Sequence, residues 1–114
     1  MPNFTPYIYL FFAIICEVVG TLLLPLSQNF TKPIPTIALS LAYIFAFYFL
    51  TFSIKYIPLT IVYSTWTGIG VFSISILSYF IYNQALGWQT IIGLILIVIG
   101  VTIINTFESK IIYE

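Results

Sequence analysis

Residues 7–24 read YIYLFFAIICEVVGTLLL, an apolar run that contains one carboxylate, Glu17. A transmembrane helix needs about 20 apolar residues, so this run predicts a membrane-spanning helix over about 7–26. At about 1.5 Å per residue, Glu17 lies about 15 Å from Tyr7, close to the midplane of a hydrocarbon core about 30 Å thick. Because an acid at that depth costs about 3 kcal/mol or more, intramembrane acids usually face a cavity and serve a function. We interpret Glu17 as functional; the alternative is a protonated or paired structural residue.

The whole chain is too apolar for a water-soluble domain. Of its 114 residues, 61% are hydrophobic and 5% are charged, whereas soluble domains carry about 25% charged residues. Three lysines balance three glutamates, which leaves no basic patch for nucleic acid. The sequence has no histidine, no aspartate and one cysteine, so it offers no metal cluster and no intrachain disulfide. It also shows no nucleophile–base pair or phosphate loop. We therefore expect an integral membrane protein without a cofactor, and not an enzyme.

Three more apolar runs predict spans over about 36–54, 59–82 and 88–107. The predicted fold is an all-α integral membrane protein with four transmembrane helices, forming a single domain over residues 1–114. Four short helices enclose little space, so we expect an oligomer. Lys32 falls on the side of the membrane opposite to Lys55 and Lys110, and this near balance permits both orientations. Two copies of opposite orientation could then pair antiparallel.

Small and polar residues surround Glu17 on one face of the first span. Ala13, Gly20 and Thr21 share that face by i, i+3 and i+4 spacing, and Tyr7 lies on roughly the same side. Small side chains at these positions leave room for a ligand or a partner helix to approach the carboxylate. A small-residue packing seam would explain the alanine and the glycine, but not the acid.

Aromatic side chains form matching faces on two other spans. The third span carries Tyr63, Trp66, Thr67 and Gly70 at helical spacing, and the second carries Tyr43 and Phe47. The ring faces of such residues attract organic cations, at about 0.5–2 kcal/mol per ring. Together with Glu17, these residues predict an aromatic-lined cavity for cations. Simple aromatic packing is the alternative.

Glycines mark two further features. Gly68 and Gly70 lie close together in the third span, where paired small residues permit a bend. The fourth span has glycines seven residues apart and no ionisable group, which is typical of a helix-dimerisation seam. The residues of that seam are Gly93, Ile97, Gly100, Val101 and Ile104.

Motifs along nearly the whole chain resemble one family. They are CEVVGT at 16–21, FTK at 30–32, YIP at 56–58, VYSTWTGIG at 62–70 and GVTIIN at 100–105. In combination with four spans, they resemble the small multidrug resistance family of proton-coupled exporters. The glutamate and the Trp-Thr-Gly-x-Gly segment are the specific parts of this resemblance.

The resemblance implies an antiparallel, dual-topology homodimer in a bacterial inner membrane. It also implies that Glu17 of both subunits binds either protons or a cationic substrate. The matching positions imply further roles: Tyr43, Tyr63 and Trp66 line the cavity, Tyr7 is an additional contact, Thr21 and Thr67 are polar residues near the site, and Gly68 and Gly70 form the bend that exchanges inward-open and outward-open states.

The chain departs from the family pattern at three positions. Pro25 stands where family members usually carry a lysine, which predicts a shorter first helix and a different loop exit. Gly20 and Ala46 stand where guanidinium-exporting relatives have tryptophan and serine. Since Gly20 leaves space that an indole would fill, we expect bulky quaternary ammonium and polyaromatic cations as substrates.

The predicted mechanism is competition between protons and cations for Glu17. Burial disfavours the charged carboxylate, so Glu17 should hold a proton near neutral pH and release it when a cation arrives. The expected partners are therefore a second copy of the chain, the lipid bilayer, protons and lipophilic organic cations. The alternatives are a guanidinium or other small-cation exporter, one half of a heterodimeric exporter, an accessory membrane subunit, and a proton or cation channel.

Overall fold

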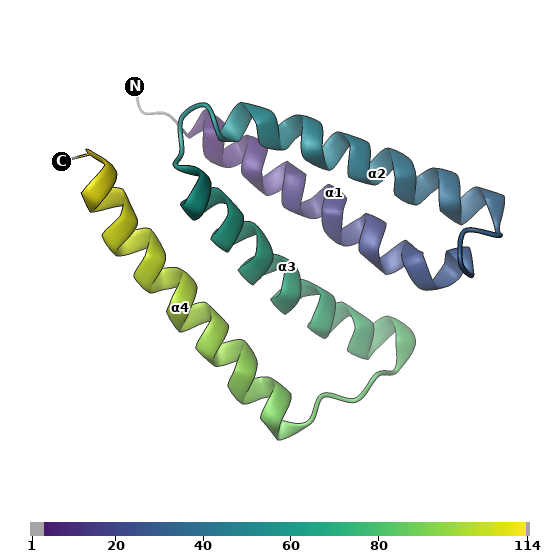
Figure 1. Ribbon diagram of the computed structural model, residues 1–114. Coiled ribbons are helices and arrows are strands. Elements are labelled where there is room, and N and C mark those ends of the chain that lie inside the picture. Colours follow the sequence, from purple (N-terminus) through teal and green to yellow (C-terminus); the bar gives the residue numbers. More distant parts are fainter. Residues whose placement is uncertain (1–3, 114) are drawn as a thin grey trace. The chain divides into compact units, whose positions relative to one another are not determined.

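The chain forms four long α-helices, as the sequence predicts. The computed structural model describes residues 4–113, and the side chains of residues 4–107. In order, the helices are α1 (Thr5–Ser27), α2 (Pro33–Ser53), α3 (Leu59–Tyr82) and α4 (Trp88–Tyr113) (Figure 1). Each one is long and apolar enough to cross a membrane. The four-helix, all-α expectation is therefore confirmed.

Proline positions explain where the helices begin. Pro6 lies in the first turn of α1, and Pro33 and Pro35 lie in the first turn of α2. Proline suits a first turn because its missing N–H has no helical partner there. The predicted second span began at residue 36, so α2 begins three residues earlier. Pro58 directly precedes α3.

The first helix does not stop at Pro25. Proline lacks the N–H that would bond the carbonyl four residues earlier, so it normally weakens or kinks a helix interior. Here α1 continues through Pro25 to Ser27, and its termination comes from Gln28, Asn29 and Phe30, which all adopt positive φ angles. The left-handed residues end α1 two residues after Pro25, and the expectation of a helix shorter than in similar proteins stays a prediction.

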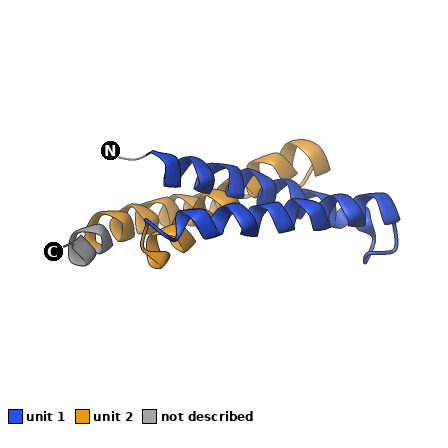
Figure 2. Ribbon diagram, turned by 90° about the horizontal axis from the view of Figure 1, so that it is seen from above, with its two compact units in different colours: residues 1–56 blue, residues 57–114 orange. Residues whose placement is uncertain are grey.

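The chain divides into two compact units, Met1–Tyr56 and Ile57–Glu114 (Figure 2). In the first unit, α1 and α2 lie side by side and run in opposite directions (Figure 1). At one end of this pair, the buried Ser53 hydroxyl donates a 2.8 Å hydrogen bond to the Pro6 carbonyl. Ala13 and Ala46 have no exposed surface, and the small size of their side chains lets the two helices approach closely.

In the second unit, α3 packs against α4. Asn105 on α4 donates a 3.2 Å hydrogen bond from Nδ2 to Thr65 Oγ1 on α3. Most large apolar side chains of α4 are exposed, among them Ile92, Ile95 and Leu96. In a bilayer, such a helix faces lipid or another protein. The single-domain organisation expected over residues 1–114 stays a prediction.

Candidate functional site

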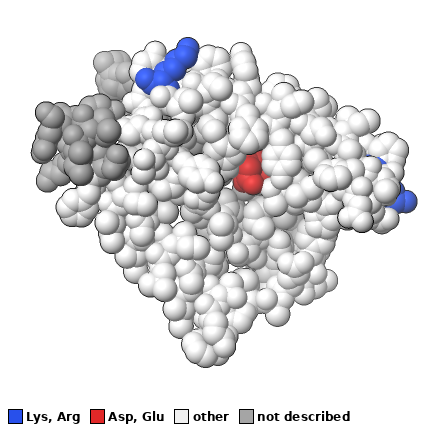
Figure 3. Space-filling view, viewed as in Figure 1, with Lys and Arg blue, Asp and Glu red and all other residues white. Residues whose placement is uncertain are grey.

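Glu17 lies near the middle of α1, with 12 residues before it and 10 after it in the helix. At about 1.5 Å per residue, it is about 15–18 Å from either helix end. Figure 3 shows one red patch surrounded by white side chains, and Glu17 is the one acidic residue among residues 4–107, whose side chains the structure describes. A hydrophobic helix of this length is long enough to span the hydrocarbon core. The carboxylate therefore lies near the centre of a membrane-length helix, and its depth in a bilayer stays a prediction.

The two oxygens of this carboxylate have different surroundings. Oε2 accepts a 2.8 Å hydrogen bond from the Thr21 hydroxyl, one turn further along α1. Oε1 is buried and has no hydrogen-bond partner among the residues that the structure describes. A buried acceptor without a partner is uncommon and costly in a folded protein. This oxygen therefore lacks the hydrogen-bond partner that a buried acceptor normally has.

Tyr43 extends the site from α1 to α2. Its phenolic oxygen lies 2.6 Å from Thr21 Oγ1, which joins Tyr43, Thr21 and Glu17 in one hydrogen-bonded chain. Such a chain positions the carboxylate more firmly than a single bond, because each hydroxyl polarises the next. The sequence groups Thr21 with Glu17 by helical spacing, and the structure adds Tyr43 to them.

Gly20 provides the space in which the Tyr43 ring lies. A methyl group at Gly20 would place its carbon 3.3 Å from Cε1 and Cζ of that ring. This separation is tighter than ordinary van der Waals contact, so the ring would have to move by a few tenths of an ångström. The absence of a side chain at Gly20 therefore helps Tyr43 to reach Thr21.

We expect Gly20→Ala to weaken the Tyr43–Thr21 hydrogen bond, because the new methyl group displaces the ring. Overpacking of this kind costs about 1 kcal/mol at the low end of its range, so cation affinity should fall by about fivefold. Isothermal titration with tetraphenylphosphonium checks this expectation. Ser40→Ala is the control, since this exposed hydroxyl donates to the Thr36 carbonyl of its own helix. An unchanged affinity in Gly20→Ala would contradict the assigned role.

The other residues predicted for the cavity differ in their exposure. In the first unit, Ala13 is fully buried, whereas Tyr7 and Phe47 are exposed. In the second unit, Trp66 is 8% exposed and Tyr63 is 65% exposed. Their approach to Glu17 stays a prediction, as does that of Thr67, whose hydroxyl donates to the Tyr63 and Ser64 carbonyls of its own helix.

The glycines of α3 and α4 differ in their surroundings. Helix α3 is assigned as one α-helix across Gly68 and Gly70, and the predicted bend there stays a prediction. A methyl carbon at Gly68 would lie only 2.6 Å from Val101 Cγ2 on α4. By contrast, Gly93 and Gly100 have open space around them in the same chain. They are free to take part in the predicted dimer seam with Ile97, Val101 and Ile104, although Val101 also packs against α3.

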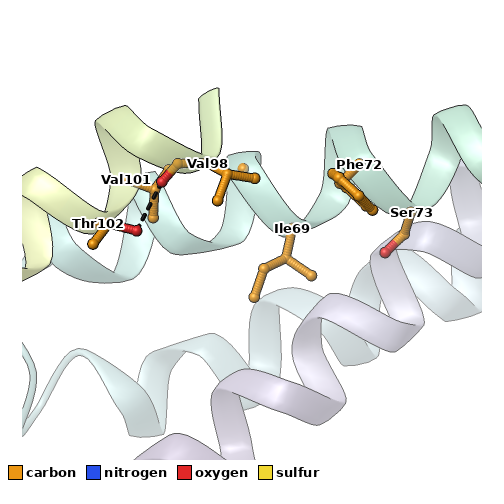
Figure 4. Close-up of a pocket in the computed structure, with 7 residues that line it drawn as sticks. Ile69, Phe72, Ser73, Val98, Val101 and Thr102 are labelled. Carbon is orange, nitrogen blue, oxygen red and sulfur yellow. Dashed lines mark hydrogen bonds between the residues drawn. The ribbon is translucent and has the colours of Figure 1, made fainter. Parts of the chain in front are cut away.

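An apolar cavity that no sequence pattern predicts lies between α3 and α4. Figure 4 shows side chains from both helices around it. Its volume is ≈ 290 Å³, and its lining residues are Gly68, Ile69, Phe72, Ser73, Val98, Val101 and Thr102. The Thr102 hydroxyl donates to the Val98 carbonyl of its own helix. Since no lining residue is charged, this cavity lacks the chemistry to select cations.

A second feature that the sequence did not indicate is an aromatic cluster on the α1–α2 pair. Its core is Tyr9 stacked on Phe52 at 4.8 Å between ring centroids, with Tyr48 edge-on to Phe52 at 5.1 Å. Lys55 Nζ lies 5.3 Å from the Phe52 ring centroid, so this ring already has a cation beside it. Among the described residues, no group of three or more His, Cys, Asp or Glu side chains could hold a metal ion.

Comparisons with known proteins agree on one family. The family model described as Small Multidrug Resistance protein matches residues 5–97. The quaternary ammonium compound-resistance protein QacH of Staphylococcus saprophyticus is 38% identical over 105 residues, which cover 92% of this chain and 98% of QacH. QacG of Staphylococcus sp. (strain ST94) is 42% identical, covering 91% and 97%. The multidrug transporter EmrE of Escherichia coli (strain K12) is 43% identical, covering 92% and 96%.

Proposed function

Because this chain belongs to the small multidrug resistance family, a family of multi-pass membrane transporters, we propose that it exports lipophilic quaternary ammonium and polyaromatic cations in exchange for protons. The observation that carries this proposal is Glu17, a carboxylate near the middle of an apolar helix of membrane-spanning length, with one oxygen bonded to Thr21 and the other buried without a partner among the described residues. The relatives named above come from bacteria, and the proposed location is a bacterial inner membrane.

Proton and cation compete for the same carboxylate in this mechanism. An ionised Glu17 attracts an organic cation, whereas a protonated Glu17 is neutral and attracts it much less. A cation that binds at mid-membrane depth therefore displaces the proton, and a returning proton displaces the cation. This competition is enough to couple their movements in opposite directions.

The proposed substrate class rests on the side chains near the acid, because the Tyr43 ring occupies the space that Gly20 leaves. Gly20 has no side chain, and Ala46 on α2 is small and fully buried. Neither residue fills the site or offers a hydrogen bond that would select a small planar cation. Tyr43 presents an aromatic ring next to Glu17 through Thr21, and such rings attract bulky cations. The names of QacH and QacG, which refer to quaternary ammonium compounds, support the same class.

The proposed assembly is an antiparallel homodimer. Most of the surface of α4 is apolar and exposed, and Gly93 and Gly100 leave room for a close helix contact. Lys32 follows α1, and Lys55 follows α2, so positive charge is present at both ends of the first helix pair. This arrangement sets no strong orientation, and two copies of opposite orientation would place two Glu17 side chains in one site.

We expect tetraphenylphosphonium to bind the purified protein more weakly as the pH falls from 9 to 5. The sign follows from the competition: acid protonates Glu17, and the neutral carboxyl no longer attracts the cation. Equilibrium binding across this range is the direct measurement, and in weak buffer each binding event should also release protons. Binding with the same affinity at every pH would contradict proton competition. A failure to bind any lipophilic cation would favour an accessory subunit, whereas binding without export would favour half of a heterodimer.

A further inference from the structure

The two oxygens of Glu17 are chemically distinct before any ligand arrives. Thr21 Oγ1 lies 2.8 Å from Oε2, whereas Oε1 is buried and has no partner among the described residues. A threonine hydroxyl has one hydrogen to donate. When it donates that hydrogen to Oε2, it cannot also donate to Tyr43. The phenol, 2.6 Å away, must then be the donor to Thr21.

The hydroxyl chain therefore has a direction, from Tyr43 to Thr21 to Glu17. In this direction, both hydroxyl hydrogens point toward the carboxylate. A proton on Oε2 would face the hydrogen of Thr21, and the Thr21 hydroxyl would have to rotate to accommodate it. A proton on Oε1 requires no such rotation, and it gives this buried oxygen the hydrogen it lacks.

We propose that Thr21 is a positioning residue that reserves Oε1 of Glu17 for the proton or the cation, and that Tyr43 acts on the carboxylate through Thr21. This inference rests on the proposed exchange of protons for cations, and it assigns that exchange to one oxygen. The titratable group that α2 brings to this carboxylate is Tyr43. The two lysines of this unit lie at the ends of α2: Lys32 directly precedes its first residue, and Lys55 lies two residues after its last.

The direction of these hydrogen bonds also determines how they affect the protonation of Glu17. Hydrogen bonds donated to a carboxylate stabilise the charged form over the neutral form. Removing the Thr21 hydroxyl should therefore favour the proton in its competition with the cation. The sign follows directly: cation binding should be lost at a higher pH in the variant than in the wild type.

The first test compares Thr21→Val with the wild type by tetraphenylphosphonium binding across pH 5 to 9. Valine keeps the shape of threonine and removes the hydroxyl. The pH of half-maximal binding should rise by about one unit, given the usual strength of a hydrogen bond to a charged group. Thr21→Ser should restore the wild-type value. Thr51→Val is the matched control, because that hydroxyl donates only to the Tyr48 carbonyl of its own helix.

The order of the hydrogen-bonded groups, Tyr43 to Thr21 to Glu17, gives a second test. Tyr43→Phe should raise the same pH midpoint by less than Thr21→Val does, since the phenol acts one bond further away. In a Thr21→Val background, Tyr43→Phe should leave the midpoint unchanged, because the connection is already broken. Equal shifts from Tyr43→Phe in both backgrounds would overturn the proposed order. The midpoint is the readout, because Tyr43 is also a candidate substrate contact and its loss can lower affinity at every pH.

Infrared spectroscopy identifies the protonated oxygen without any ligand. The difference between spectra of wild-type protein and Glu17→Gln at low pH isolates the carboxyl stretch of Glu17. With the proton on Oε1, the carbonyl oxygen is Oε2, which Thr21 bonds, so Thr21→Val should move the stretch to higher frequency. An unmoved stretch, together with an unmoved pH midpoint, would overturn the proposal. The proposed function would survive that result, provided that binding still depends on pH and on Glu17.

Discussion

Replacing Glu17 by Gln is expected to lower tetraphenylphosphonium affinity by about 100-fold and to remove its dependence on pH. Glutamine has nearly the same shape but cannot become negative, so the cation loses its counter-charge at mid-membrane depth. Truncating one partner of a buried, charged contact typically costs about 2–5 kcal/mol, which corresponds to a loss of this size. Binding of the cation from pH 5 to 9 measures both effects, and export by cells or proteoliposomes should be abolished.

Two variants separate the charge of Glu17 from its position. Glu17→Asp keeps the charge and withdraws it by one methylene group, so binding should weaken but remain dependent on pH. Cys16→Ala changes the neighbouring residue, which points about 100° away around the helix, and should bind like the wild type. Export by Glu17→Gln at the wild-type rate would contradict the proposed mechanism, and the carboxylate would then be structural.

Hydropathy was sufficient to predict the helices of this chain. Each apolar run is about as long as a bilayer is thick, and short polar or proline-containing segments separate the runs. The face of α1 that carries Glu17 and Thr21 could also be predicted from the sequence, because residues four apart lie one above the other on a helix. The Thr21–Glu17 hydrogen bond is therefore within reach of sequence reasoning alone.

Contacts between helices were harder to predict from the sequence. Nothing in the spacing of Tyr43 shows that its hydroxyl reaches Thr21, because helical periodicity gives the direction of a side chain but not the height of one helix against the next. The same limit applies to Gly68. Its sequence context indicated a bend, whereas its close neighbour in the structure is Val101, 33 residues further along the chain.

Helix ends were also difficult to predict, because local rules compete there. Pro25 was expected to weaken the end of α1, yet the helix continues past it. Three consecutive residues with positive φ, Gln28 to Phe30, then reverse the chain. Asparagine tolerates this conformation, but glutamine and phenylalanine adopt it rarely. Neither residue type therefore signals a left-handed turn from sequence.

Replacing Gly68 by Ala is expected to destabilise the α3–α4 pair by about 1–2 kcal/mol. The new methyl carbon would lie 2.6 Å from Val101 Cγ2, which is far inside van der Waals contact. Valine in a helix is held in one χ1 rotamer, so it cannot easily turn the methyl group away. Overpacking typically costs about 1–3 kcal/mol, and so close a contact falls in the upper part of that range. A net loss of about 1–2 kcal/mol therefore remains after the roughly 1 kcal/mol that alanine gains over glycine in helix propensity. Thermal unfolding in detergent measures the loss.

Val101→Ala supplies the compensating change, because it removes the methyl group with which Gly68→Ala collides. We expect the double variant to unfold at a higher temperature than Gly68→Ala alone, with a coupling energy of about 1 kcal/mol or more between the two sites. Gly100→Ala adds the same methyl group to α4 where no atom of the chain lies within 4 Å, so it should not destabilise the isolated chain. If Gly68→Ala unfolds like the wild type, then α3 and α4 can separate at little cost. The glycine would then serve the predicted bend in α3 and not the close packing of the two helices.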